Sequence, residues 1–419
     1  MDALLQLEPH VLPMIAIGLA VALTAAFITR RSRLSKGPHS VSHFNSLSAN
    51  GKDPNKDRKH GDWTAVPFNY PRITPSPTYV LDTKPIPYRP FRWGDYHITM
   101  GIRTMPWDEW IEAPLELVQE LAEYLSVRYP ETFRIIRQVQ ADVDPKSFVQ
   151  EGWEGHPPVK SVTIVPQGVT YELNQNAEDM MKVAALLVQD DMALMIEGED
   201  GKYYFQAGAI CVAGFWRMED KIGLPLDAIH VSGNVPQFRE KLETSMERFF
   251  RRLAVDKAVI RNNYFIQVVK PEEEQRATAT PNEYGDLDPE ELAWSNTTNG
   301  PEDTFHHGHP ATSHDSPTVL PSTIRLRTER QTLRRLPKSG AILFTIRTYL
   351  FPVTELAKEK GVPARMASAI RSWPADVAKY KGQTLYRDVL IDYLDECAHA
   401  QVANGVVEEG ERVKAEYPF

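Results

Sequence analysis

Residues 207–253 read AGAICVAGFWRMEDKIGLPLDAIHVSGNVPQFREKLETSMERFFRRL, and the expected fold can be built outward from this stretch. It opens with an apolar run at Ala209–Phe215, which predicts a β-strand. A lone histidine, His230, follows between Ile229 and Val231. The stretch closes with a predicted amphipathic helix, because apolar residues recur there every three or four positions. These residues are Phe238, Leu242, Met246, Phe249 and Leu253.

The apolar surroundings of His230 leave two interpretations open. A single histidine among apolar residues is most often a structural side chain, either in the core or capping a helix. The sharper interpretation is an axial ligand of haem iron. Neutral imidazole binds iron, and apolar walls would exclude water from the haem.

The composition limits the classes of protein to which the chain can belong. Its 419 residues are 42% hydrophobic, which is enough for a substantial core. A net charge of −9, with no basic stripe, argues against nucleic-acid binding. Only Cys211 and Cys397 are present, so this chain alone cannot ligate a four-thiolate iron–sulfur cluster. It also lacks the motifs of self-contained nicotinamide enzymes, NTPases and familiar hydrolases.

The N-terminus predicts a single membrane-spanning helix. Val11–Thr29 contains no charged residue, and at about 1.5 Å per residue it would extend roughly 28 Å, just enough to cross a bilayer core. Basic residues follow at once within 30–36, which favours an outside N-terminus and a cytosolic body. The charges of a cleaved signal peptide would instead precede the apolar run. We expect residues 1–30 to be an anchor in the endoplasmic reticulum membrane.

Two polar segments delimit the predicted body. Residues 31–62 have no hydrophobic periodicity and predict a flexible linker. Residues 272–322 are rich in Pro, Thr, Asn, Asp and Glu, and this composition predicts a disordered segment. Because strand-like sequence lies on both sides of it, we expect the segment to be an insertion within one domain. The insertion contains four histidines that would bind metal only weakly without order, namely His306, His307, His309 and His314. We expect one domain at 63–403 and a tail at 404–419.

The pattern within this domain predicts an α+β fold. Helices fit the ranges Leu115–Tyr129, Ala177–Gln189, Pro363–Lys379 and Leu385–Ala403. A hairpin is expected at 193–215 with its turn at Asp200-Gly201, a strand at 259–269, and a second hairpin at 323–353. The sum is an antiparallel sheet of about five strands with helices packed on it.

The second hairpin carries many ionisable side chains. Strand alternation places Arg327 and Glu329 on one side and Arg330 on the other, while Arg347 faces Glu329 or Arg330 depending on the register. One interpretation is a solvated face with cross-strand ion pairs. The other is a polar pocket in which arginines hold carboxylates and Glu329 binds or deprotonates a cationic ligand.

Four segments resemble a known family, the haem-dependent oxidative N-demethylase alpha subunits. They are MGIRTMPWDEWI (100–111), DDMALMIEGEDGKYYFQAGAICVAGFWRMEDKIGLPLDAIH (190–230), LRTERQTLRRLPKSGAILFTIRTYLFPV (326–353) and YKG (380–382). The resemblance spans about residues 85–395. It implies a PAS-like haem-binding domain and NADPH-dependent oxidation of a secondary methylamine of the dimethylamine type. The loop after His230, IHVSGNVPQF, is longer than is usual in the family.

The resemblance also implies roles for individual residues. His230 becomes the candidate axial ligand of a haem b iron. Arg327, Arg330 and Arg347 become candidates for the haem propionates or the oxygen pocket, with Arg330 counted with Glu329 among the catalytic candidates. Glu329 becomes the candidate partner of the amine, since a carboxylate attracts an ammonium strongly where water is scarce.

The expected function is a membrane-anchored haem monooxygenase that uses O2 and demethylates a small secondary amine. NADPH, FMN and a 2Fe–2S cluster are expected only on a separate reductase, in agreement with the two cysteines of this chain. The alternative from another class is a non-catalytic haem-binding sensor or carrier, because a fold does not fix a function. A scaffold that has lost haem is a third possibility.

Overall fold

The computed structural model describes residues 54–66, 68, 73–76, 89, 91–97, 103–104, 117–138, 156–173, 177–271, 289–302, 305 and 317–414. They all belong to the unit Lys52–Phe419, which is separate from the unit Met1–Gly51. The predicted anchor, most of the predicted linker and the four clustered histidines lie outside the described residues. Within the described part of the chain, no helix is both long and apolar enough to cross a bilayer.

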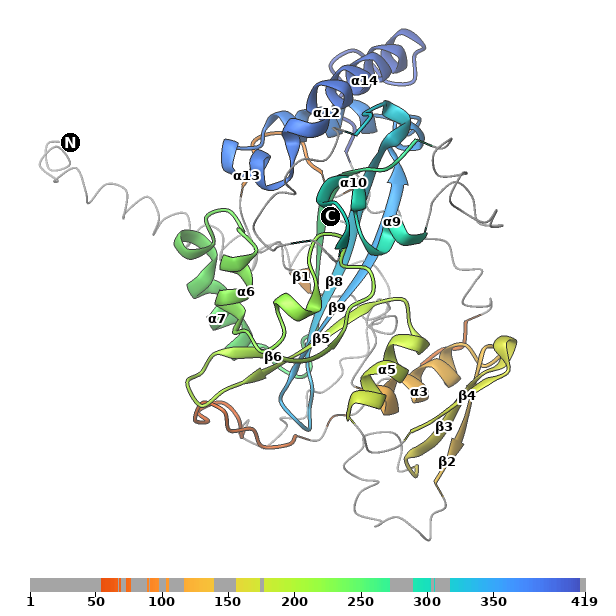
Figure 1. The fold of residues 1–419 in the computed structure, drawn as a ribbon, viewed down its shortest axis with the longest axis vertical. Helices are drawn as coiled ribbons and strands as arrows, with labels where there is room; N and C mark the ends of the chain where they lie inside the picture. The colour runs from red at the N-terminus through yellow and green to blue at the C-terminus, as the bar shows by residue number, and fades with distance from the viewer. Residues whose placement is uncertain are drawn as a thin grey trace, which may run out of the picture. The chain divides into compact units, whose positions relative to one another are not determined.

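A six-stranded sheet forms the centre of the described fold, with the strand order β1-β7-β8-β9-β5-β6 (Figure 1). All its strand pairs are antiparallel. The strands are β1 Arg103–Thr104, β5 Asp191–Glu197, β6 Tyr203–Ala209, β7 Val259–Val268, β8 Ile324–Arg335 and β9 Ile342–Pro352. Both predicted hairpins, the strand at 259–269 and the α+β class are confirmed.

The register of the β8–β9 hairpin settles which ionisable residues share a face. Arg330 pairs directly with Arg347, and Glu329 pairs with Thr348. Directly paired residues point to the same side of a sheet, and neighbours along a strand point to opposite sides. We therefore name the two faces by the helices that cover them. The α6 face, named after helix α6 Leu226–Ser232, carries Glu329, and the α12 face, named after helix α12 Val362–Arg371, carries Arg330 and Leu326.

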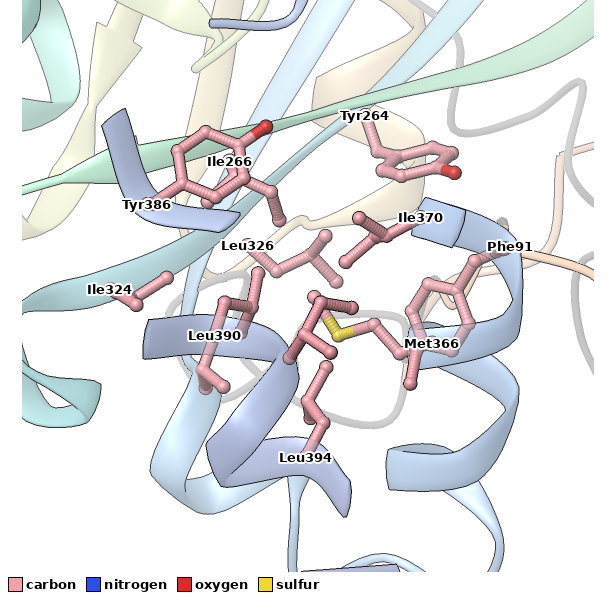
Figure 2. Packing of buried hydrophobic residues seen from close by; sticks show 14 of the residues in the cluster. Phe91, Tyr264, Ile266, Ile324, Leu326, Met366, Ile370, Tyr386, Leu390 and Leu394 are labelled. Carbon is pink, nitrogen blue, oxygen red and sulfur yellow. The ribbon is translucent and has the colours of Figure 1, made fainter. Parts of the chain in front are cut away.

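Four C-terminal helices pack on one end of the α12 face. They are α11 Val353–Leu356, α12 Val362–Arg371, α13 Ala375–Tyr380 and α14 Gln383–Ala403. Figure 2 shows Leu326 and Ile266 of the sheet in contact with an apolar cluster that includes Met366, Ile370 and Leu390 of these helices. The single helix expected at 363–379 is divided in two, because Pro374 immediately precedes α13 and caps it.

A second group of elements packs near the other end of the same face. Helices α3 Leu117–Arg128 and α5 Ala177–Leu187 share an apolar cluster with Leu194 and Leu343 of the sheet. The same cluster includes residues of a three-stranded sheet, β2 Phe133–Arg137, β3 Val159–Ile164 and β4 Val169–Glu172. This smaller sheet was not predicted from the sequence.

Residues 226–253 cover one end of the α6 face. Helix α6 Leu226–Ser232 contains His230, and a π-helical turn at Phe238–Leu242 leads into α7 Glu243–Arg252. Phe238, Met246, Phe250 and Leu253 are buried against Val259, Leu333 and Ile342 of the sheet. The predicted amphipathic helix is thus confirmed.

The strand expected at Ala209–Phe215 is wrong, since β6 ends at Ala209. The chain leaves the sheet there because the Asp191 carboxylate accepts hydrogen bonds from the backbone amides of Cys211 and Val212. Gly214 then takes a left-handed conformation, φ +76°. Short helices complete the described structure: η3 Val165–Gln167, η4 Met218–Asp220, α9 Pro289–Ala293, α10 Asn296–Asn299 and η7 Pro321–Thr323. The PAS-like topology stays a prediction.

A matched pair of glycines tests the packing of the β8–β9 turn. Gly340 and Gly405 share the same left-handed φ of +68°, but a Cβ at Gly340 would overlap the Trp63 indole, whereas nothing lies within 4 Å at Gly405. We expect Gly405→Ala to cost about 1 kcal/mol of backbone strain. Gly340→Ala should cost roughly 2 kcal/mol more, because Trp63 must move. Chemical denaturation followed by tryptophan fluorescence measures both, and equal losses would contradict the described contact.

Candidate functional site

A strip of polar side chains crosses the middle of the α6 face. Glu329 of β8 lies between Asn263 of β7 and Thr348 of β9, and Gln331 lies opposite Arg261. At one end of the strip is the apolar cluster under α6 and α7. At the other end, Gln267 and Arg327 bind the backbone of α9. The polar strip is thus what remains of the face between two covered ends.

Glu329 accepts hydrogen bonds from two carboxamides, and the charges of Arg261, Arg327 and Lys381 act on it without a direct ion pair. Gln331 Nε2 donates to its Oε2 at 2.8 Å, and Asn263 Nδ2 donates to the same oxygen at 3.4 Å. The side chain is buried, and its second oxygen, Oε1, makes no hydrogen bond with a described residue. A carboxylate that is oriented by neutral donors and keeps one oxygen open can accept a further donor, including a cationic one.

Several polar atoms of the strip are buried without a hydrogen-bond partner. They are Arg261 Nε, Gln331 Oε1 and Thr348 Oγ1. Arg261 interacts electrostatically with Glu329 and Tyr380, and burial lowers its pKa below the ordinary value. Leaving such groups unsatisfied typically costs about 1–3 kcal/mol each, so three of them beside one buried carboxylate suit a ligand that completes them.

His230 has the geometry of an axial ligand. Its Nδ1 lies 2.7 Å from the Leu226 carbonyl oxygen, and the ring stacks on Phe238 with centroids 4.8 Å apart and an interplanar angle of 10°. Burial lowers the pKa of His230, and the charge of Arg261 lowers it further. The lowered pKa favours the neutral ring, and the carbonyl oxygen at Nδ1 calls for the proton there, which leaves the lone pair on Nε2, the arrangement of a metal-ligating histidine.

These observations fit a haem group. The imidazole of His230 is fixed through Nδ1 with Nε2 available to a ligand, and the charge of Arg261 acts on both His230 and Glu329. Arg261 has unsatisfied donor capacity, which a propionate carboxylate would fill. Aromatic rings border the strip, with Phe215 and Phe265 centroids 5.5 Å apart and Phe265 and Tyr380 centroids 5.7 Å apart. Such a wall provides the apolar surface that a porphyrin needs.

Lys381 attaches the end of α13 to the edge of β7. Its ammonium donates to the Tyr264 carbonyl oxygen at 2.6 Å and lies over three rings, those of Tyr264, Phe265 and Trp373. The preceding residue, Tyr380, packs on Phe265 beside the strip. Lys381 thereby keeps the aromatic wall in place, and Gln237 Nε2 adds a second link by donating to Asp376 at 2.6 Å.

Arg327 shares the α6 face with Glu329, but its guanidinium is bound by the protein itself. It donates to the carbonyl oxygens of Val212 and Leu292, at 2.8 Å for the second, and lies over the Phe215 ring. A Cβ at Gly214 would overlap the guanidinium. Arg327 thus organises the loop after β6 and the end of α9, and its Nε lacks a partner among the described residues.

Arg330 and Arg347 lie on the α12 face, away from Glu329. Arg347 forms an ion pair with Asp190, with Nη2 at 2.7 Å from Oδ2, and donates to Gln189 at 3.1 Å. The structure therefore brings Glu329 and Arg327 together on one face and places Arg330 and Arg347 on the other. The five residues singled out from the sequence, His230 included, do not form a single cluster.

Arg261, Gln331 and Tyr380 were missed by the sequence reasoning. A signal existed in β7, because the polar triplet Arg261–Asn263 interrupts an otherwise apolar strand. The structure also describes residues 289–302, which fall within the insertion predicted to be disordered. There Ser295 N donates to the Gly214 carbonyl oxygen at 2.9 Å, and Gly214 N donates to Ala293 at 2.8 Å. The prediction of disorder does not hold for this part of the insertion.

Residues 102–391 match a protein-family model described as haem-dependent oxidative N-demethylase, alpha subunit-like. The match covers more than half of the chain and includes His230, all of β7 to β9, and Lys381. The chain therefore belongs to this family, as the resemblance implied, and the family is one of haem-dependent oxidoreductases.

The burial of Lys381 predicts a pH-dependent stability. Burial lowers its pKa to about 7, whereas the ordinary value is 10.5. Between these values the unfolded chain binds more protons, so stability should rise with pH from 7 and level off near 10.5. From pH 7 to pH 9 the wild type should gain roughly 2 kcal/mol from this residue. Urea unfolding at the two pH values measures the gain.

The Lys381→Met variant is the control for this prediction. It keeps the length of the side chain but cannot titrate, so its stability should lack that part of the rise. Groups common to both proteins, such as Lys221, whose pKa is lowered to about 8 by burial, cancel in the comparison. A rise of equal size in the wild type and the variant would show that Lys381 does not titrate in this range.

Proposed function

We propose that this chain is a haem-dependent monooxygenase that removes a methyl group from a small secondary amine of the dimethylamine type. The observation that carries the proposal is the polar strip itself. A buried carboxylate and unsatisfied polar atoms lie on the sheet face that His230 and its helix cover. Membership of the oxidative N-demethylase family supports the class of reaction.

His230 would hold the haem iron through Nε2. Its Nδ1–H, donated to the Leu226 carbonyl oxygen, fixes the ring orientation and raises the electron density of the ligating nitrogen. Arg261 would bind a propionate through its unsatisfied guanidinium. When bound, haem b supplies the site for O2 binding and activation.

Glu329 would bind the substrate as an ammonium ion. Its Oε2 is occupied by Gln331 and Asn263, which leaves Oε1 to accept an N–H of the amine. The contact between opposite charges is strong because the carboxylate is buried. It fixes the nitrogen and thereby the direction of the methyl groups, which orients the substrate for attack. The same oxygen can take a proton from the ammonium, as a general base.

The proposal assigns electron supply to a separate protein. With two cysteines, this chain cannot ligate a four-thiolate cluster, so NADPH, FMN and a 2Fe–2S centre would belong to a partner reductase. The apolar run 11–29 would anchor the chain in the endoplasmic reticulum membrane with its body towards the cytosol. Reductase and oxygenase would then meet at one membrane surface.

Absorption spectra of the full-length chain, expressed with haem supplied, test the ligand. The wild type should show a Soret band, and His230→Ala should lose or shift it, because the variant removes the one imidazole of α6. His399→Ala is the matched control, since His399 is exposed on α14 and should leave the spectrum unchanged. A folded, colourless wild type would contradict the proposal.

Amine binding tests the role of Glu329. Dimethylamine titrated into the haem-loaded chain should perturb the Soret band, and Glu329→Gln should weaken the apparent affinity by roughly 10- to 100-fold. The loss follows from replacing a charged acceptor by a neutral one of the same shape. Glu355→Gln, at an exposed position, serves as the control. Haem binding without amine binding or formaldehyde release across a methylamine panel would instead favour a sensor or carrier.

A further inference from the structure

The polar strip contains a second acceptor beside Glu329. Gln331 is 7% exposed, and its carboxamide oxygen, Oε1, has no hydrogen-bond partner. The nitrogen of the same carboxamide donates to Glu329 Oε2 at 2.8 Å. That bond fixes the plane of the Gln331 side chain, so a buried acceptor lies next to the carboxylate without a donor. An unsatisfied buried acceptor calls for a ligand that donates to it.

The two acceptors differ in charge but are held together. The Glu329 carboxylate shares its negative charge between its two oxygens, whereas Gln331 Oε1 belongs to a neutral carboxamide. Arg261 is the residue directly opposite Gln331, yet its Nε is also unpartnered and does not donate to this oxygen. A cation bound at Glu329 with one spare N–H would therefore find Gln331 Oε1 as its second partner.

The number of N–H groups distinguishes the classes of methylated amine. A secondary ammonium has two N–H donors, a tertiary ammonium has one, and a quaternary ammonium has none. A site that hydrogen-bonds a donor discriminates strongly against an analogue that lacks it, because a buried polar group is then left unpaired. Two acceptors on hydrogen-bonded side chains thus favour a secondary over a tertiary ammonium.

We propose that Gln331 determines specificity by accepting the second N–H of a secondary ammonium whose first N–H is bound by Glu329. The inference rests on the proposed function and extends it by naming how the class of amine is selected. In a tertiary ammonium a methyl group replaces the second N–H and would meet Gln331 Oε1. That contact places an apolar group against an unsatisfied acceptor and excludes the donor that the acceptor needs.

The test compares dimethylamine and trimethylamine binding to the full-length, haem-loaded chain, by isothermal calorimetry and by the shift of the Soret band. The wild type should bind dimethylamine at least about tenfold more tightly than trimethylamine. In Gln331→Met, which keeps the side-chain length but has no acceptor, the ratio should fall to near one. Circular dichroism confirms that the variant is folded.

Asn263→Ala separates selection from mere positioning of the carboxylate. Asn263 also donates to Glu329 Oε2, at 3.4 Å. The buried oxygen without a partner, however, belongs to Gln331 and not to Asn263. This variant should weaken both amines by a similar factor and keep their ratio. If Gln331→Met also keeps the ratio, Gln331 only orients Glu329 and the inference is wrong.

The wild-type titration alone also decides between the two proposals. A wild type that binds both amines equally overturns the role of Gln331 and leaves the amine-binding function intact. A haem-loaded wild type that binds neither amine overturns the proposed function and the inference with it. The wild-type comparison does not depend on the folding of any variant.

Discussion

The cost of burying charge governs the centre of this fold. Every residue of β8 is buried, although its sequence IRLRTERQTLRR is rich in arginine. Each buried arginine must find partners, and the surrounding segments provide them. Arg335 donates to the carbonyl oxygens of Leu253 and Gly340 at 2.7 and 2.6 Å, and Arg334 pairs with Glu120 at 3.3 Å. Arg327 binds the loop after β6 and the end of α9. Charges on one strand thus fix the positions of loops far away in sequence.

The candidate site is a place where this pairing is incomplete. Between the cluster under α6 and the segment held by Arg327, the polar groups of the α6 face have too few partners in the described structure. Glu329 keeps one oxygen free, Arg261 keeps its Nε free, and His230 is held as a neutral ring with Nε2 available. A carboxylate, a cationic donor and an imidazole, assembled on one face against aromatic rings, suit a haem with an amine bound beside it.

Much of this architecture was predictable from the sequence, because the hairpins and helices carry strong periodic signals. Alternation along β8 correctly separated Glu329 from Arg330, but the register of Arg347 depended on a turn that sequence alone did not fix. Which face would meet His230 depends on the packing of α6, which follows from contacts between residues far apart in sequence. Arg261 was missed for the same reason. The sheet β2–β4 was missed because its short strands are partly exposed and lack a clear apolar period.

The central claim is that His230 Nε2 is the ligand that the protein offers to iron. Exogenous imidazole added to the full-length His230→Gly variant tests it most directly, with the Soret band as the readout. The account predicts that the variant loses the band of the wild type and that imidazole restores it, because the added ring takes the place of the missing side chain. A His230→Gly protein that binds haem with an unchanged spectrum, before any imidazole is added, would contradict the account.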